Sequence, residues 1–221
     1  MTQKFYLRNL TASNTPTAGE KSTVLPAFTL QADNATGTEE TRSLTGTKGT
    51  TQTSIVQNTD AVTSARNGYH ARFTSNPLQA GTYGSGTWTL ALAINESNLA
   101  SNFLLACSIY FWRPSNNTVV GFVYDSNTTI GTEPPTAETG EVNNITGANI
   151  TIQDNDVLVL EIWRKNTQGS SFTRANTVFF DGTTEPTVGT GTSDAASYIN
   201  APANIPEVTV IVLPNTLLTL G

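Results

Sequence analysis

Residues 103–126, FLLACSIYFWRPSNNTVVGFVYDS, decide the fold predicted for this chain. In a strand, successive side chains point to opposite faces, so two sets of residues can be separated in the first half of this stretch. The turn-forming residues RPSNN at 113–117 predict a hairpin that joins this strand to 118–125. Both faces of the first strand are nearly free of polar groups, which predicts cover on both sides. One face carries Phe103, Leu105, Cys107, Ile109 and Phe111, and the other carries Leu104, Ala106, Ser108, Tyr110 and Trp112.

The rest of the chain repeats this strand signal. No long stretch has apolar residues at helical spacing, whereas short apolar or alternating runs bounded by turn residues are common. We therefore predict an all-β fold, specifically an antiparallel two-sheet sandwich of jelly-roll type, as one domain over residues 1–221. Long Thr/Gly-rich loops are expected at 31–66 and 183–206, and a terminal strand and tail at 207–221. Further strands are predicted at 4–10, 24–30, 69–75, 87–95, 145–153, 156–165, 172–180 and 207–213, with weak ones at 42–44 and 54–57.

Composition limits the possible partners. The chain has 221 residues, a net charge of −6 and only 13% charged residues. Without a basic stripe, binding of nucleic acid through phosphates is not expected. The N-terminus lacks the charged start and apolar run of a secretory signal, and no apolar run is long enough to span a bilayer as a helix. These features predict a protein made in a cytoplasm with no membrane partner.

Groups that could carry chemistry are sparse. His70 and Cys107 are the single histidine and cysteine, so the usual zinc sites cannot be assembled, and a thiol in an apolar strand is inert. The glycine-rich GTYGSGTW at 81–88 lacks the spacing of a phosphate loop or a nucleophile elbow. Acidic residues crowd several turns, among them Glu133, Glu138 and Glu141, but without the spacing of a calcium loop. We therefore predict no catalytic, metal or cofactor site and expect a protein that is not an enzyme. Paired carboxylates of a glycosidase are not excluded by the sequence.

The second face of strand 103–112 predicts an interface. Leaving a large apolar side chain in water forgoes roughly 1.5–3 kcal/mol, and a contiguous apolar patch usually marks a partner site. Loops of the same chain, an identical subunit or a larger surface could each provide the cover. The apolar end VTVIVLPNTLLTLG at 208–221 favours the latter two, since it could reach a neighbour as an added strand. The predicted interface residues are Leu104, Tyr110, Trp112, Val208, Val210, Val212, Leu217 and Leu218.

Five segments carry a resemblance to a known group of proteins. They are KFYLRNLTAS at 4–13, TWTLALAINESNLASN at 87–102, IYFWRPS at 109–115, DNDVLVLEIW at 154–163 and FFDGTTEP at 179–186. Together they resemble small β-sandwich structural proteins in the virions of tailed bacteriophages, and the resemblance runs along most of the chain.

This resemblance implies a role in the virion. Within that group, the chain is similar to capsid decoration (cement) proteins, which implies a homo-oligomer, expected to be a trimer, bound to the major capsid protein or to other virion proteins. The alternative is a tail-associated carbohydrate- or receptor-binding module, in which Tyr110, Trp112, Tyr124 and Trp163 would stack on sugar rings.

Overall fold

The computed structural model describes residues 1–14, 41–59, 68–100, 102–125, 129–166, 174–191 and 193–208. All regular structure in these ranges is β-strand, so they hold no helix that is long and apolar enough to cross a membrane. The strands are β1 (Gln3–Thr11), β2 (Thr41–Thr45), β3 (Thr53–Thr59), β4 (Gly68–Ser75), β5 (Gly81–Tyr83), β6 (Gly86–Glu96), β7 (Phe103–Arg113), β8 (Thr118–Asp125), β9 (Thr139–Gly147), β10 (Ile150–Ile152), β11 (Val157–Asn166), β12 (Arg174–Phe180) and β13 (Tyr198–Ala201).

The all-β prediction is confirmed, and so is the hairpin of β7 and β8, which pair antiparallel across the turn at 114–117. Other details differ from the expectation. The predicted loop 183–206 contains β13, whereas β2 and β3 confirm the weak strands expected at 42–44 and 54–57 within the predicted loop 31–66. The run at 145–153 is divided between the end of β9 and the short β10. The predicted strand at 24–30 lies outside the described residues.

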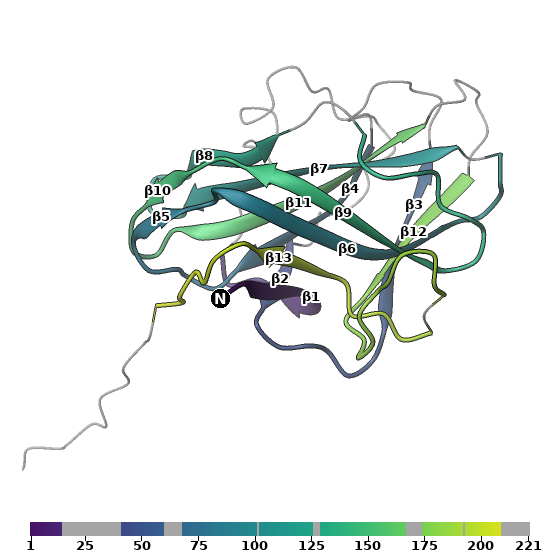
Figure 1. Ribbon diagram of the computed structural model, residues 1–221, viewed down its shortest axis with the longest axis horizontal. Helices are drawn as coiled ribbons and strands as arrows, with labels where there is room; N and C mark the ends of the chain where they lie inside the picture. The colour runs from purple at the N-terminus through teal and green to yellow at the C-terminus, as the bar shows by residue number, and fades with distance from the viewer. Residues whose placement is uncertain are drawn as a thin grey trace, which may run out of the picture.

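The strands form one large sheet and one small sheet. The large sheet has eleven strands in the order β3-β12-β6-β13-β1-β2-β4-β11-β7-β8, with β9 paired to β6. The small sheet contains β5 and β10, at the end of the molecule opposite β3 and β12 (Figure 1). β2 and β4 pair in parallel, so the large sheet is mixed. The expectation of a purely antiparallel arrangement was therefore wrong.

The large sheet curves so that strands far apart in its order, β3 and β12 on one side and β4 on the other, face one another. Phe73 of β4 and Phe180 of β12 are far apart in the strand order, yet their ring centroids lie 5.3 Å apart in an edge-to-face contact. His70 of β4 also places its Nε2 atom 3.1 Å from the carbonyl oxygen of Ile55 in β3. Curvature is what allows one face of nearly every strand to reach a single core.

That core follows the alternation read from the sequence. The first face of β7 packs against the apolar faces of β11 and β6, and all of these side chains are almost fully buried. The indole Nε1 of Trp88 donates a hydrogen bond of 2.8 Å to the carbonyl of Gly84, which satisfies its polar group inside the core. The inward-facing residues of the three strands are Leu105, Cys107, Ile109 and Phe111 in β7, Leu158, Leu160 and Ile162 in β11, and Trp88, Leu90, Leu92 and Ile94 in β6.

Candidate functional site

The predicted interface residues of β7 do not form an open surface. Tyr110 and Trp112 are 1% and 4% exposed, and they pack with Val157 and Val159 of β11. Leu104 is half-buried. Both aromatic side chains are therefore covered in the single chain.

The terminal part of the predicted interface is described only at its start. Val208 is half-buried, and its N–H donates a 2.8 Å hydrogen bond to the carbonyl of Pro77. The other predicted members, Val210, Val212, Leu217 and Leu218, lie outside the described residues.

A buried ion pair lies on the second face of β7 and β11. Glu161 of β11 accepts hydrogen bonds through one oxygen from the Nε of Arg72 at 2.8 Å and from the hydroxyl of Tyr110 at 3.0 Å. Glu161 and Arg72 are only 1% and 2% exposed. This face thus combines apolar and polar groups inside the protein. The isolated charges in YHARF and VLEIW were the sequence signal for such a pair, because a lone charge in an apolar strand needs a partner.

Burial of these residues corrects two arguments made from the sequence. The apolar face that was expected to need an outside partner is covered, so the physical reason for an interface at Tyr110 and Trp112 is gone, and their interface role stays a prediction. Trp112 and Trp163 are also too buried, at 4% and 0% exposed, to stack on a sugar ring. The predicted aromatic platform is therefore absent from this face.

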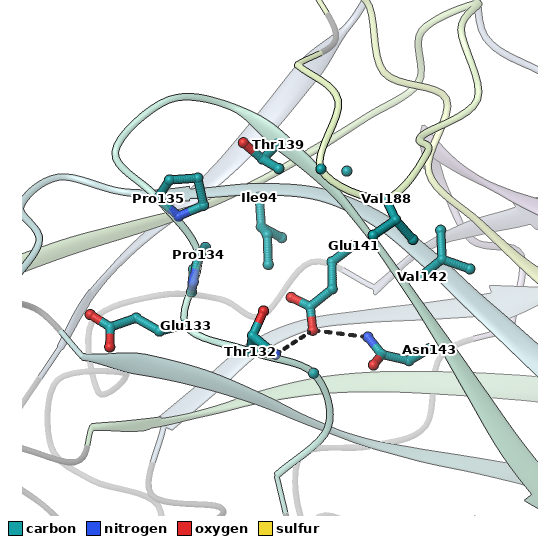
Figure 2. Close-up of a pocket in the computed structure, with 13 residues that line it drawn as sticks. Ile94, Thr132, Glu133, Pro134, Pro135, Thr139, Glu141, Val142, Asn143 and Val188 are labelled. Carbon is teal, nitrogen blue, oxygen red and sulfur yellow. Dashed lines mark hydrogen bonds between the residues drawn. The ribbon is translucent and has the colours of Figure 1, made fainter.

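The remaining candidates from the sequence are placed as follows. His70 is 1% exposed, and Cys107 is fully buried in the core. Within the described ranges, no group of three or more His, Cys, Asp and Glu side chains could hold a metal ion. The three glutamates of the 133–141 region do not converge on one point. Glu138 accepts a 2.9 Å hydrogen bond from Gln52. The Glu133 carboxylate points away from Glu141, whereas the Glu141 carboxylate is hydrogen-bonded to Thr132 (Figure 2).

A hollow of about 260 Å³ surrounds Glu141 at the start of β9. Its floor includes Ile94 of β6, and its walls come from residues 131–135, from β9 and from the loop at 188–189. Figure 2 shows one carboxylate oxygen of Glu141 bonded to Thr132 and Asn143, and the other directed into the space between Ile94 and Thr132. The hollow is thus a largely apolar recess that contains the Glu141 carboxylate, with Glu133 on its rim.

The wall at 131–135 is fixed against Glu141. The backbone N–H of Thr132 and the side-chain amide of Asn143 each donate a 3.0 Å hydrogen bond to the same oxygen, Oε1. Gly131 has a φ of 73°, and a Cβ at this position would lie 1.0 Å from that oxygen. Only glycine fits there without a rearrangement. Further along, the N–H of Glu96 donates to the carbonyl of Pro135 at 3.1 Å, which ties the same segment to β6.

The opposite wall is fixed against β9. Gly140 donates its N–H to the carbonyl of Thr190 at 3.0 Å and accepts from the N–H of Gly189 at 3.0 Å. A Cβ on Gly140 would lie 2.1 Å from the carbonyl oxygen of Thr187. This close backbone contact brings Val188, which is 73% exposed, to the rim of the hollow. Both walls are therefore held by hydrogen bonds within the chain.

Two acids line the hollow, Glu141 inside it and Glu133 on its rim, and the electrostatics inside it depend mainly on Glu141. Burial raises the pKa of Glu141 above its usual value, because desolvation outweighs the hydrogen bonds from Asn143 and Thr132. None of the thirteen lining residues is Lys, Arg or His. In the part of the chain that the structure describes, Glu141 makes no ion pair.

Glu185 differs from Glu141, because it is paired with basic side chains and its pKa is lowered. Glu185 accepts 2.6 Å hydrogen bonds from Lys4 and from the Tyr6 hydroxyl, and lies 3.3 Å from the Nζ of Lys48. Desolvation alone would raise the pKa of Glu185, but these hydrogen bonds and charges outweigh it and lower the pKa to about 2. This carboxylate is fully engaged within its own chain, so it serves the fold.

Comparison with known proteins gives only a fold likeness. No protein-family model matches this sequence, and no curated protein matches it. Two crystal structures of a CocE/NonD family hydrolase from Staphylococcus aureus are similar to the chain, with TM-scores of 0.48 and 0.45 and sequence identities of 9% and 10%. The matches cover 94% and 93% of this chain but 36% of the hydrolase, so the chain spans about a third of that protein's length.

These matches correct one expectation from the sequence. Since the similar solved structures are hydrolases, the prediction that this chain is not an enzyme is withdrawn. The likeness transfers no activity to this chain, because at such identity and TM-score it carries no information on a reaction or a catalytic residue.

Proposed function

We propose that this protein is a structural protein of a tailed-bacteriophage virion and that it acts by contact with other virion proteins, as a capsid decoration protein does. The hollow around Glu141 carries this proposal: two walls fixed by backbone hydrogen bonds enclose an acid with no basic side chain among the lining residues. A preformed recess of this kind suits contact with another molecule. The sequence resemblance, which falls largely on β1, β6, β7 and β11, supplies the virion context.

We also propose a finer description of the fold. The contact between Phe73 and Phe180 and the approach of β3 to β4 support a sheet folded into two packed layers, similar to a jelly-roll sandwich. A layered all-β framework with fixed connections suits a protein that must keep its shape on a particle surface. The proposed assembly is a homotrimer on the shell, which would occupy sites between neighbouring capsid subunits.

The test is binding to capsids that lack this protein. Purified full-length chain is mixed with such capsids, and bound protein is quantified after sedimentation. Saturation at hundreds of copies per particle, together with a similar copy number in purified virions, is the expected result. A copy number of a few would instead place the protein at the tail, and no binding to any virion component would overturn the proposal.

A second candidate is the tail-associated carbohydrate-binding module, which is favoured by the size of the hollow. A volume of about 260 Å³ lies below the roughly 300–1,000 Å³ of drug-sized pockets, so it suits one sugar unit or one amino-acid side chain. A glycan array decides for this candidate if one glycan binds to the wild type and not to Glu141→Gln. An array without binding rejects it.

A further inference from the structure

We propose that the hollow around Glu141 binds a basic side chain, arginine or lysine, presented by a partner protein. This inference rests on the proposed function, since it names the group by which a virion partner would be recognised. The starting observation is geometric: one oxygen of Glu141 is held by Thr132 and Asn143, and the other points into the hollow (Figure 2).

The hydrogen-bonding groups that line the hollow favour a bound group that donates hydrogen bonds. The N–H of Thr132 and the amide of Asn143 are used by Glu141, and the N–H groups of Gly140 and Gly189 are used between the two backbone segments. Pro134 and Pro135 have no N–H. Several of the donors that line the hollow are therefore already engaged, while a carboxylate oxygen stays available as an acceptor.

The negative charge of the hollow favours a cation among the groups that could donate these hydrogen bonds. The protein carries a net charge of −6, and none of the described lining residues is a base that could neutralise Glu141. A guanidinium or ammonium group supplies several N–H donors and no acceptor, whereas a sugar hydroxyl presents both. An ion pair formed in this partly desolvated recess would also relieve the cost of keeping Glu141 charged there.

The apolar walls favour a cation carried on an alkyl chain, as in arginine and lysine. Ile94, Pro134, Val142 and Val188 line the hollow around the acid. Arginine and lysine carry an alkyl stem that packs on apolar surface while the charged end reaches a polar group. The size of the hollow, about 260 Å³, is below that of drug-sized pockets. One inserted arginine or lysine side chain would thus fit the size, the charge and the apolar lining of the hollow.

The first experiment uses small probes and the purified full-length chain. N-acetyl-arginine amide is titrated into labelled protein while amide signals of Gly131, Thr132 and the Asn143 side chain are followed by NMR, with N-acetyl-glutamine amide and methyl glucoside as neutral probes. We expect saturable, millimolar binding of the arginine probe alone. Absence of saturable shifts at these residues, or equal binding of the neutral glutamine probe, overturns the proposal. Binding of the glucoside in preference to arginine overturns it in favour of a sugar site.

A matched pair of variants separates the site from general charge. Glu141→Gln keeps the side-chain length, and Glu133→Gln removes the same charge from a carboxylate on the rim that points away from the hollow (Figure 2). We expect Glu141→Gln to weaken arginine binding about tenfold or more and Glu133→Gln to change it less than about twofold. Equal weakening by both variants would mean long-range attraction only and would overturn the proposal.

Capsid binding then distinguishes this inference from the proposed function. If wild type binds capsids and Glu141→Gln binds about tenfold more weakly, the basic side chain belongs to the virion partner. If both bind equally, the virion role stands and the proposed use of the hollow is wrong. If neither binds while the arginine probe still does, the virion function fails, and with it the partner named here.

Discussion

Two glutamates in this protein, Glu161 and Glu141, are both withdrawn from bulk water but have different surroundings. Glu161 is 1% exposed and is paired with Arg72 and Tyr110 on the second face of the β11–β7 half of the sheet. Glu141 is half-buried at the start of β9, and its partners are an amide and a backbone N–H. A carboxylate that is paired inside its own chain contributes to the fold, whereas one that lacks a cation is available to another molecule.

The largest effect is expected at Trp112, which packs with Tyr110, Val157 and Val159 on the same sheet face as Glu161. Trp112→Ala removes a side chain that is 4% exposed, which should lower the free energy of unfolding by about 3–5 kcal/mol. Urea unfolding measures this change, and size-exclusion chromatography measures the assembly state. A Trp112→Ala variant that keeps its stability but changes its assembly state would support the interface role predicted for Trp112 from the sequence.

The next largest effect concerns the ion pair itself. Glu161→Gln leaves the buried Arg72 without its carboxylate and should cost about 3 kcal/mol, again measured by urea unfolding. The double variant Arg72→Met/Glu161→Gln is the control, and it should recover part of the loss because no uncompensated charge stays buried. A loss below about 1 kcal/mol for the single variant would mean that the pair does not stabilise the fold.

A smaller, pH-dependent effect is expected at Glu185, the paired acid near the surface. Its pKa is lowered to about 2 from an ordinary 4.5, so its stabilisation is complete above about pH 4.5 and is lost as the pH falls towards 2. Glu185→Gln should therefore cost about 1–2 kcal/mol at pH 7 and less at pH 3. Thermal unfolding at both pH values checks this. A stability difference that grows on acidification would contradict the assignment.

The smallest effect, of opposite sign, is expected at Glu141. Its pKa is raised by burial, so the charged form opposes folding above that pKa, and the penalty disappears as the pH falls below the ordinary value. Glu141→Gln should raise the stability at pH 7 by less than about 1 kcal/mol and leave it nearly unchanged at pH 4. Glu133→Gln is the control. Strong destabilisation by Glu141→Gln would give this acid a structural role like that of Glu161.

Local patterns were enough to predict the main strands. The alternation in 87–95 and the apolar run in 103–112 predicted β6 and β7, since each side chain's face follows from its position alone. The strands that were missed have weak patterns: β13 is four residues long and β5 is three. Such short segments become strands because a neighbouring strand supplies hydrogen bonds, and that neighbour is distant in the sequence.

The sequence identified some residues of the candidate site but did not predict the site itself. The sequence showed that Glu133, Glu138 and Glu141 crowd one region without the spacing of a calcium loop, and no site was predicted there. Nothing local distinguishes the three side chains. Their different roles arise because Asn143 and Thr132 meet one of them, Gln52 meets another, and the loop at 187–190 packs on Gly140 from the far end of the chain.

The sequence by itself determined that the chain is all-β, how the side chains of β7 divide between its two faces, and that β7 is apolar on both of them. Those properties depend on neighbours along the strand. Only the tertiary structure decided that the second face of β7 is covered, that Arg72 meets Glu161, and that Glu141 lies in a hollow and makes no ion pair with the described residues. Those outcomes depend on which distant segments meet when the large sheet curves, because burial and charge pairing are set by contacts across space.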